Sequence, residues 1–386
     1  MTHDTNIPQG YKATALGIIP QEWEVMRLGD IVSITSGESP SLYHLKAEGK
    51  YPYVKVEDLN NCEKYQESSR EYSDDNNTTI KAGSIIFPKR GASILNNKVR
   101  IAAKDIQMDS NMMAITPHTT IVDTEFLYIR ILHERLYRIA DTSSIPQINN
   151  KHIIPYKIAV PPLAEQRKIA EVLGVWDKAI EKQARLIEKL ALRKRALMQR
   201  LLSAKLRLPG FSEPWKKVKL GDVAELYQPQ TIQSEDLSQT GYPVYGANGL
   251  IGYYNNYNHE YPQVVITCRG SSCGTVNFTP GKCWITGNAM VLNVDNNRDV
   301  NKSFFYYLIS NSSFVNLISG SGQPQIVRQP LLKFELRIPP LKEQTAIAEV
   351  LTAADREIDL AKEKLERLRR QKRGLMQQLL TGKKRI

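Results

Sequence analysis

The sequence predicts an α+β protein: two tandem α/β domains joined by two long helices that pack as an antiparallel coiled coil. Three observations lead to this fold class. A segment at 161–202 returns at 339–380, both copies carry a sustained heptad pattern, and short apolar runs bounded by Gly or Pro fill the regions between them. The duplication also predicts an approximate two-fold axis. We expect the first domain with an N-terminal extension at 1–160, the first helix and spacer at 161–208, the second domain at 209–338 and the second helix at 339–386.

The repeat is long and continuous. Pro161–Gln166 reads Pro-Pro-Leu-Ala-Glu-Gln, and Pro339–Gln344 reads Pro-Pro-Leu-Lys-Glu-Gln. Upstream, the tripeptide Pro-Gln-Ile at Pro146–Ile148 reappears at Pro324–Ile326. A repeat of about 180 residues far exceeds a solenoid unit, so it indicates a duplicated domain together with its helix.

Apolar residues in both repeated segments recur at steps of three and four, which predicts helices that share a seam. The first seam is Ile169, Leu173, Trp176, Ile180, Gln183, Ile187, Leu190, Lys194, Leu197 and Leu201. The second seam is Ile347, Leu351, Ala354, Ile358, Ala361, Leu365, Leu368, Lys372, Leu375 and Leu379. A helix from Leu163 to Leu202 would be on the order of 60 Å long, and the second is expected to run back along it. We expect large Trp176 to face small Ala354 and to help fix the register.

The domain interiors differ in sequence and length, but both predict mixed structure. Apolar runs at 83–88 and 263–267 are typical of buried strands. Residues 126–136 and 304–318 have apolar positions at helical spacing, so we expect one helix of this kind in each domain.

The net charge of +12 is unevenly distributed along the 386 residues. Residues 189–208 hold seven basic and no acidic residues, and residues 367–386 hold eight and none. These two helix ends therefore carry +15, which leaves the rest of the chain at −3. The helix dipole accounts for a few cations at a helix C-terminus, but not for this many. A polyanion or an acidic protein surface is the expected partner.

No self-sufficient active site is predicted. The sequence lacks a GxxxxGK[ST] phosphate loop, a GxGxxG fingerprint and the Asn/Asp-Pro-Pro-aromatic tetrapeptide of amino-methyltransferases. The four cysteines, Cys62, Cys268, Cys273 and Cys283, lack zinc-ligand spacing and suit a reduced cytoplasm. No run is long enough to cross a membrane. We therefore expect a non-catalytic chain without a metal or cofactor of its own.

The duplicated frame resembles the DNA-specificity subunit of type I restriction–modification enzymes, and the resemblance spans nearly the whole chain. The residues that carry it are Gly17–Trp23 before Leu28–Asp30, Leu208–Phe211 before Trp215 and Leu220–Asp222, the two Pro-Pro-Leu-x-Glu-Gln helix starts, the helix ends Lys194–Leu202 and Lys372–Leu380, and Tyr245–Gly252.

This resemblance implies two target-recognition domains, each reading one half of a bipartite double-stranded DNA sequence. It also implies that the helices set the spacing and dock two methyltransferase subunits carrying S-adenosylmethionine. Restriction subunits that use ATP and Mg²⁺ would join the full complex in the cytoplasm of a prokaryote. The alternative is a coiled-coil scaffold that joins two protein-binding domains.

Five residues are candidates for DNA contact. Lys89 and Arg90 follow one predicted strand and Arg269 follows another, each Arg preceding a glycine. Arginine can grip phosphate or read guanine through two hydrogen bonds. Tyr245 and Asn248 lie in a Gly-rich loop. A plain surface turn is the alternative interpretation for all five.

The basic helix ends are the candidates for partner docking. Arg193, Lys194 and Arg195 lie on the first helix, and Lys372 and Arg373 occupy equivalent positions on the second. Their concentration on two helix ends favours binding to an acidic partner surface or to phosphates between the half-sites.

Overall fold

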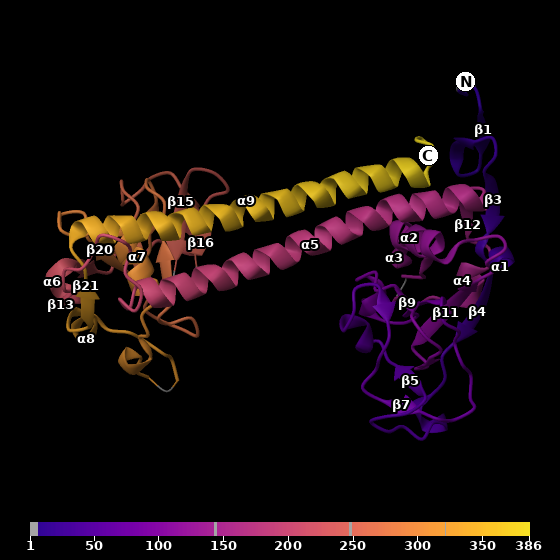
Figure 1. Ribbon diagram of the computed structural model, residues 1–386, viewed down its shortest axis with the longest axis horizontal. Helices are drawn as coiled ribbons and strands as arrows, with labels where there is room; N and C mark the ends of the chain where they lie inside the picture. Colours follow the sequence, from indigo (N-terminus) through magenta and orange to yellow (C-terminus); the bar gives the residue numbers. More distant parts are fainter. Residues whose placement is uncertain (1–6, 143–144, 247–248, 321) are drawn as a thin grey trace. The chain divides into compact units, whose positions relative to one another are not determined.

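The computed structural model describes residues 7–142, 145–246, 249–320 and 322–386, and the chain divides into two compact units. Unit 1 is formed by Met1–Lys182 and Leu365–Ile386, and unit 2 by Gln183–Lys364. Each unit contains a globular domain, one end of helix α5 and the opposite end of helix α9 (Figure 1). The long helices are α5 (Leu163–Leu201) and α9 (Leu341–Leu380). The predicted helix at Leu163–Leu202 is thereby confirmed to within one residue.

The domain of unit 1 is built on two sheets. The main sheet has the strand order β4-β11-β8-β9-β6, and a small sheet has the order β10-β5-β7. The strands are β4 (Val32–Ser36), β5 (Tyr51–Val54), β6 (Tyr65–Gln66), β7 (Tyr72–Ser73), β8 (Ile85–Pro88), β9 (Arg100–Ala102), β10 (Gln107–Met108) and β11 (Met112–Pro117).

Unit 2 repeats this topology although its interior sequence differs. Its main sheet has the order β14-β20-β17-β18, and its small sheet the order β16-β15-β19. The strands are β14 (Glu225–Tyr227), β15 (Tyr242–Gly246), β16 (Gly249–Tyr254), β17 (Val264–Thr267), β18 (Val276–Phe278), β19 (Trp284–Ile285) and β20 (Ala289–Asn293). In each small sheet, the central strand (β5 or β15) has one parallel and one antiparallel neighbour. In the main sheet, β6 of unit 1 is the one strand without a counterpart among the described strands of unit 2.

Each domain connects to its long helix through a two-stranded ribbon. The ribbons are β3 (Glu24–Arg27) with β12 (Lys157–Val160) in unit 1, and β13 (Lys216–Lys219) with β21 (Glu335–Ile338) in unit 2. Unit 1 has a further hairpin of β1 (Tyr11–Thr14) and β2 (Gly17–Pro20). The short helices are α1 (Leu28–Ile31), α2 (Thr124–Glu134), α3 (Leu136–Ile139), α4 (Asn150–Ile153), α6 (Leu220–Val223), α7 (Lys302–Ser310) and α8 (Arg328–Leu332).

The predicted helices at 126–136 and 304–318 correspond to α2 and α7. The second prediction was too long, because α7 ends at Ser310 and a separate 3-10 turn follows at Val315–Leu317. Asn311, Ser312 and Ser313 lie between them. Short polar side chains of this kind compete for backbone hydrogen bonds and so favour helix ends.

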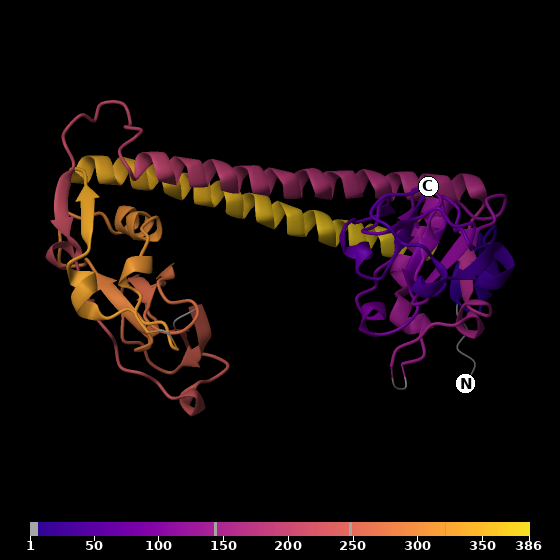
Figure 2. The ribbon, with the colours of Figure 1, turned by 90° about the horizontal axis from the view of Figure 1, so that it is seen from below.

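Alternate residues of the central strands face two cores. On β8, Ile85 and Phe87 belong to a large core that includes α2, while Ile86 faces a smaller core under the small sheet. On β17, Val264 and Ile266 face the large core and Val265 the smaller one. Burial on both faces explains why these strands read as continuous apolar runs. In each unit, the large core extends onto both long helices, next to α2 or α7 (Figures 1 and 2).

The helices run antiparallel within each unit. In unit 1, Glu165 pairs with Arg385 and Asp177 with Lys372, so the partner number falls as the α5 number rises. In unit 2, Lys194 pairs with Asp355, next to Ala354. Trp176 adjoins Asp177, and the expectation that it faces Ala354 is wrong. The two residues occupy equivalent positions 178 residues apart (354 minus 176), and the duplication makes such positions counterparts rather than partners.

The repeated Glu-Gln pair at each helix start holds the helix to its domain. Gln166 accepts a hydrogen bond from Asp123 N (2.8 Å) and donates to Ile121 O (2.9 Å) and Pro161 O (2.8 Å). Buried Glu165 accepts hydrogen bonds from Trp23 Nε1 (3.0 Å) and from Arg385 near the chain end (2.6 Å). The sequence motif is therefore a structural clamp.

Gln344 in unit 2 makes the same three bonds as Gln166. It accepts from Asn301 N and donates to Asp299 O and Pro339 O, each at 2.9 Å. Arg207 pairs with buried Glu343 (2.6 Å), as Arg385 does with Glu165. The tail after each long helix thus closes onto the start of the other helix.

Candidate nucleic-acid interface

In each unit, the turn after a central strand presents an arginine. Lys89 and Arg90 follow β8, and Arg269 lies two residues after β17 ends at Thr267. The next residue is Gly91 in one turn, with φ of +86°, and Gly270 in the other, with φ of +85°. L-residues rarely adopt this backbone conformation, so the glycine allows the chain to reverse just after the arginine.

The repeated Pro-Gln-Ile tripeptides hold these turns from the other side. Gly91 N donates to Pro146 O (2.8 Å), and Gly270 N donates to Pro324 O (3.0 Å). Arg90 forms an isolated antiparallel bridge with Gln147, and Arg269 forms one with Gln325. Each arginine therefore has a glutamine directly beside it.

The tripeptides are anchored in the cores by their isoleucines. Ile148 is fully buried and Ile326 is 3% exposed. Ile148 N donates to Lys89 O (2.8 Å), and Ile326 N donates to Cys268 O (2.9 Å). The residues before β11 and β20 close the same turns, because Asn111 O accepts from Lys89 N (2.8 Å) and Asn288 O from Cys268 N (3.1 Å). The turns are rigid although their side chains reach solvent.

The arginine side chains remain available to a ligand. Arg90 and Arg269 are exposed, and neither guanidinium has an ion pair or hydrogen bond with any residue that the structure describes. Burial lowers the pKa of Lys89, and positive Arg90 beside it lowers that pKa further. An approaching phosphate would relieve this repulsion and favour the charged form of Lys89. The arrangement suits an anion at the edge of each domain.

The glutamines complete a set of hydrogen-bonding groups suited to base edges. Arginine pairs with O6 and N7 of guanine, and glutamine pairs with N6 and N7 of adenine. Sequence reasoning singled out Arg90 and Arg269 but missed Gln147 and Gln325 as site residues. The repetition of Pro-Gln-Ile was visible, but only the fold brings it beside residues more than fifty positions away.

The two remaining DNA candidates differ from the arginines. Tyr245 lies one residue before the end of strand β15, where its carbonyl accepts from Thr286 N (2.9 Å), and its ring packs against the smaller core of unit 2. Burial raises the pKa of its hydroxyl. Asn248 lies outside the described residues. Tyr245 thus has a structural role that the arginines lack.

Two of the docking candidates, Lys194 and Lys372, are partly buried and form ion pairs with the other long helix. Lys194 pairs with Asp355 and lies 5.3 Å from the ring centroid of Tyr307, whose hydroxyl donates to the same carboxylate (2.7 Å). In the equivalent place, Lys372 pairs with Asp177. These two lysines link the helices to each other.

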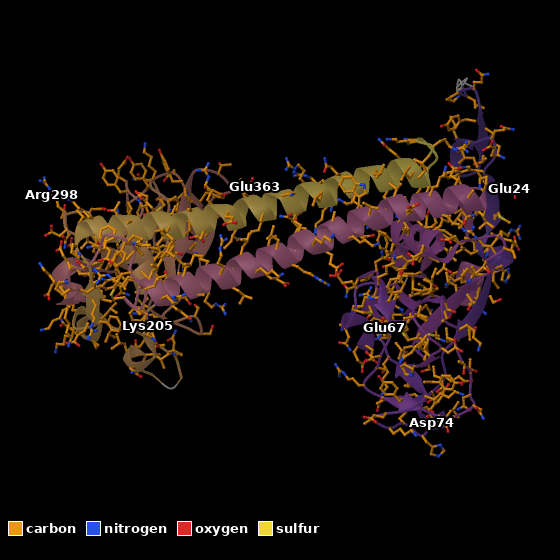
Figure 3. All side chains as sticks on the ribbon, viewed as in Figure 1. Glu24, Glu67, Asp74, Lys205, Arg298 and Glu363 are labelled. Atoms are coloured by element: carbon orange, nitrogen blue, oxygen red, sulfur yellow. The ribbon has the colours of Figure 1, made fainter. Side chains whose placement is uncertain are left out.

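Arg193, Arg195 and Arg373 project from the helix surface instead. Arg193 forms an ion pair with Glu357 in which both side chains are about half exposed. Arg195 and Arg373 are exposed and have no ion pair within the described residues. Figure 3 shows the side chains of both units on the ribbon, with Glu363 labelled on α9. Of the five docking candidates, Arg195 and Arg373 are the ones with unpaired charge.

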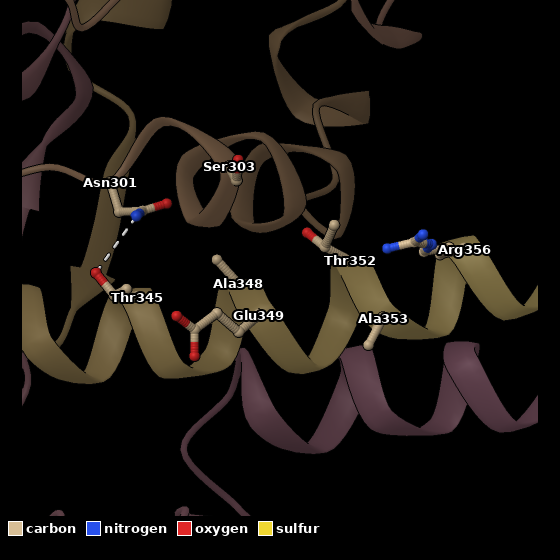
Figure 4. A pocket seen from close by; sticks show the side chains of 8 residues that line it. All are labelled: Asn301, Ser303, Thr345, Ala348, Glu349, Thr352, Ala353 and Arg356. Atoms are coloured by element: carbon tan, nitrogen blue, oxygen red, sulfur yellow. Dashed lines mark hydrogen bonds between the residues drawn. The ribbon is translucent and has the colours of Figure 1, made fainter.

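A groove in unit 2 lies between the start of α7 and the first turns of α9 (Figure 4). Its volume is about 450 Å³, and small side chains form much of its lining. Glu349 and Arg356 supply its charged groups. The lining residues are Asn301, Ser303, Thr345, Ala348, Glu349, Thr352, Ala353 and Arg356.

Neither a metal centre nor a membrane span is found in the described ranges. No group of three or more His, Cys, Asp or Glu side chains there could hold a metal ion. None of the helices in those ranges is long and apolar enough to cross a membrane.

A family model described as the type I restriction modification DNA specificity domain matches residues 20–191 and 212–370. The type I restriction enzyme MjaVIII specificity subunit of Methanocaldococcus jannaschii is 24% identical, over 95% of this chain and 94% of that protein. The putative MjaX specificity subunit of the same organism is 25% identical, over 98% and 97%. The crystal structure of a type I S subunit from M. genitalium has a TM-score of 0.61 at 19% identity and covers 98% of each chain, which shows a shared fold.

Proposed function

This chain belongs to the family of type I restriction–modification specificity subunits, and from that premise we propose that each of its two units reads one half of a bipartite DNA sequence. The observation that carries this proposal is an exposed arginine with a glutamine beside it on a rigid turn. It occurs once in each unit, as Arg90 with Gln147 and Arg269 with Gln325.

Rigidity matters here because base readout requires donors and acceptors at fixed positions, whereas phosphate binding requires mainly charge. Backbone hydrogen bonds hold both turns, and buried isoleucines hold the segments behind them. Only the side chains at the edge are free to adjust. Two such edges in one chain suit a target with two specified halves.

The long helices would set the distance between the half-sites and dock two methyltransferase subunits. Exposed Arg195 and Arg373 are the docking groups we favour, together with the groove of Figure 4. Lys194 and Lys372 would act indirectly by fixing the helix pair. Restriction subunits are the further proposed partners of the full complex.

We place no catalytic step in this chain. S-adenosylmethionine, ATP and Mg²⁺ would be bound by the partner subunits, in the cytoplasm of a prokaryote. The family match favours DNA recognition over the alternative of a coiled-coil scaffold that joins two protein-binding domains.

The test is to express the chain with its methyltransferase subunits and map methylated bases across a host genome. The expected result is a motif with two specified halves separated by an unspecified spacer of constant length. Substituting Arg90 or Arg269 should alter one half each. A continuous motif, or methylation without sequence preference, would contradict the proposal.

A further inference from the structure

Unit 1 has a basic groove beside its connecting ribbon. Two adjoining hollows of about 690 and 550 Å³ share Lys157 as a lining residue. Lys151 lines the first hollow, and Lys12 and Arg27 line the second. Helix α4, hairpin β1–β2 and strands β3 and β12 supply these four side chains.

The positive charge of this groove is largely uncompensated. Lys157 lies directly opposite Arg27 across the β3–β12 ribbon, where like charges repel each other. None of the four basic side chains has an ion pair or a side-chain hydrogen bond with a described residue. Lining residue Glu134 is already engaged by Arg130 (2.7 Å) and by the hydroxyl of Tyr156 (2.7 Å). Four cations against the remaining acid, Asp30, leave a charge of +3.

The equivalent positions of unit 2 do not repeat this charge. The cross-strand pair that corresponds to Arg27 and Lys157 is Lys219 opposite Glu335, a pair of opposite charges. The counterpart of Lys151, 178 residues later, is Gln329. A ligand that recognises this charge would therefore bind unit 1 and not unit 2. Such a ligand would bind once per chain, whereas a partner that recognises the duplicated features would bind twice.

The lining is also apolar, which favours a peptide over nucleic acid. Leu16, Ile139 and Pro155 line the first hollow and Val25 lines the second. Leu16 is 42% exposed, so its side chain is accessible to a ligand in the groove. Within the described strands, β12 pairs with β3 alone and β1 with β2 alone, so each keeps an open edge. An added peptide strand can hydrogen-bond to such an edge.

We propose that this groove binds, once per chain, an extended segment of a partner protein in which Asp or Glu alternates with aliphatic residues. Alternation follows from the geometry of a strand, whose successive side chains point to opposite faces. The carboxylates would lie against Lys151, Lys157 and Arg27, and the aliphatic side chains against Leu16 and Val25. This interaction goes beyond the recognition of DNA and does not depend on it.

The test is a selection of random-sequence displayed peptides on the full-length chain, followed by fluorescence anisotropy of the enriched peptides. The discriminating variant is Lys157→Glu, because it recreates the opposite-charge pair that unit 2 already accommodates and should therefore fold. Glu335→Lys is the matched control, since it places like charges opposite each other in unit 2. Thermal unfolding and DNA preference of both variants would be measured alongside.

The enriched peptides should contain acidic and aliphatic residues. Lys157→Glu should lower the affinity for these peptides about tenfold, whereas Glu335→Lys should leave the affinity unchanged. Enrichment of peptides that bind wild type and Lys157→Glu equally would overturn the proposal. So would an oligothymidylate strand that binds more tightly than any peptide and loses affinity in Lys157→Glu, because the ligand would then be nucleic acid. If the wild-type chain showed no preference for any DNA sequence, that result would contradict the proposed function but not the peptide proposal.

Discussion

Gln344→Ala should destabilise unit 2 selectively, because it removes the clamp between α9 and the domain. Three hydrogen bonds are lost, to Asn301 N, Asp299 O and Pro339 O, and the Gln344 side chain that makes them is 1% exposed. At a net contribution of about 1 kcal/mol for each bond, the expected loss is about 3 kcal/mol. The backbone groups left behind are partly buried, so the loss should not fall far below that figure.

For a unit of this size, a loss of about 3 kcal/mol corresponds to a fall in Tm of about 6–12 °C. Calorimetry would measure the transition, and hydrogen exchange resolved along the sequence would show whether α7 and the start of α9 open first. Gln166→Ala should affect unit 1 in the same way, since Gln166 makes the equivalent bonds. Gln371→Ala, at an exposed site on the same helix α9, is the control. A change in Tm of under about 2 °C, or equal loss of protection in both units, would refute the reasoning.

Four further predictions concern the arginine turn of unit 2, the long helices and the buried His259. If Arg269 reads guanine, Arg269→Ala should weaken DNA binding by about 1–3 kcal/mol and relax the base preference at one half-site. If it binds phosphate instead, the dependence of log affinity on log salt concentration should become shallower by about one. Competition binding at two salt concentrations distinguishes these outcomes, with Arg298→Ala, after the C-terminal end of β20, as the control. Inserting one helical turn of about four residues in both α5 and α9 lengthens each helix by about 6 Å, which should lengthen the tolerated spacer by about two base pairs. An unchanged spacer in the methylation motif would show that the helices do not set its length. Replacing the basic residues Arg193–Arg195 with Gln should weaken methyltransferase assembly, measured by sedimentation, without altering base preference; an altered preference would assign them to readout. Burial lowers the pKa of His259 below its ordinary 6.5, so His259 of the unfolded chain binds a proton at a higher pH than His259 of the folded chain does. The contribution of His259 to the stability of unit 2 should therefore be constant above about pH 6.5 and decline below it, as measured by unfolding across pH. A decline of equal size in His259→Asn would show that other groups cause it.

The long helices could be read from the sequence because their signal is local and repeated. Steps of three and four place the apolar side chains on one face whatever the rest of the chain does. The direction of pairing also followed, since a second helix that leaves the second domain with the same seam packs most simply by running back along the first. Their register did not follow, and the expected Trp176–Ala354 contact shows why. Register depends on which side chains meet across the interface, as Asp177 and Lys372 do.

The shared topology of the two interiors could not be predicted. Strands β5 and β15 have the same kinds of neighbours although little of the surrounding sequence corresponds. Strand pairing is made by backbone groups, which every residue carries, so unrelated sequences can form one sheet order. The alternation of Ile85 and Ile86 between two cores was also invisible, since both are apolar.

The sequence by itself determined the duplication, the two helices, the basic helix ends and the two arginine turns, because each rests on residues close together in the chain. Only the tertiary structure placed Gln147 beside Arg90 and Gln325 beside Arg269, and only it set Arg27 opposite Lys157. These pairs join residues 56 to 130 positions apart (325 minus 269, 157 minus 27). Contacts between residues so far apart in the sequence are formed by sheet pairing and core packing. The local sequence around each residue does not identify the residue that it meets.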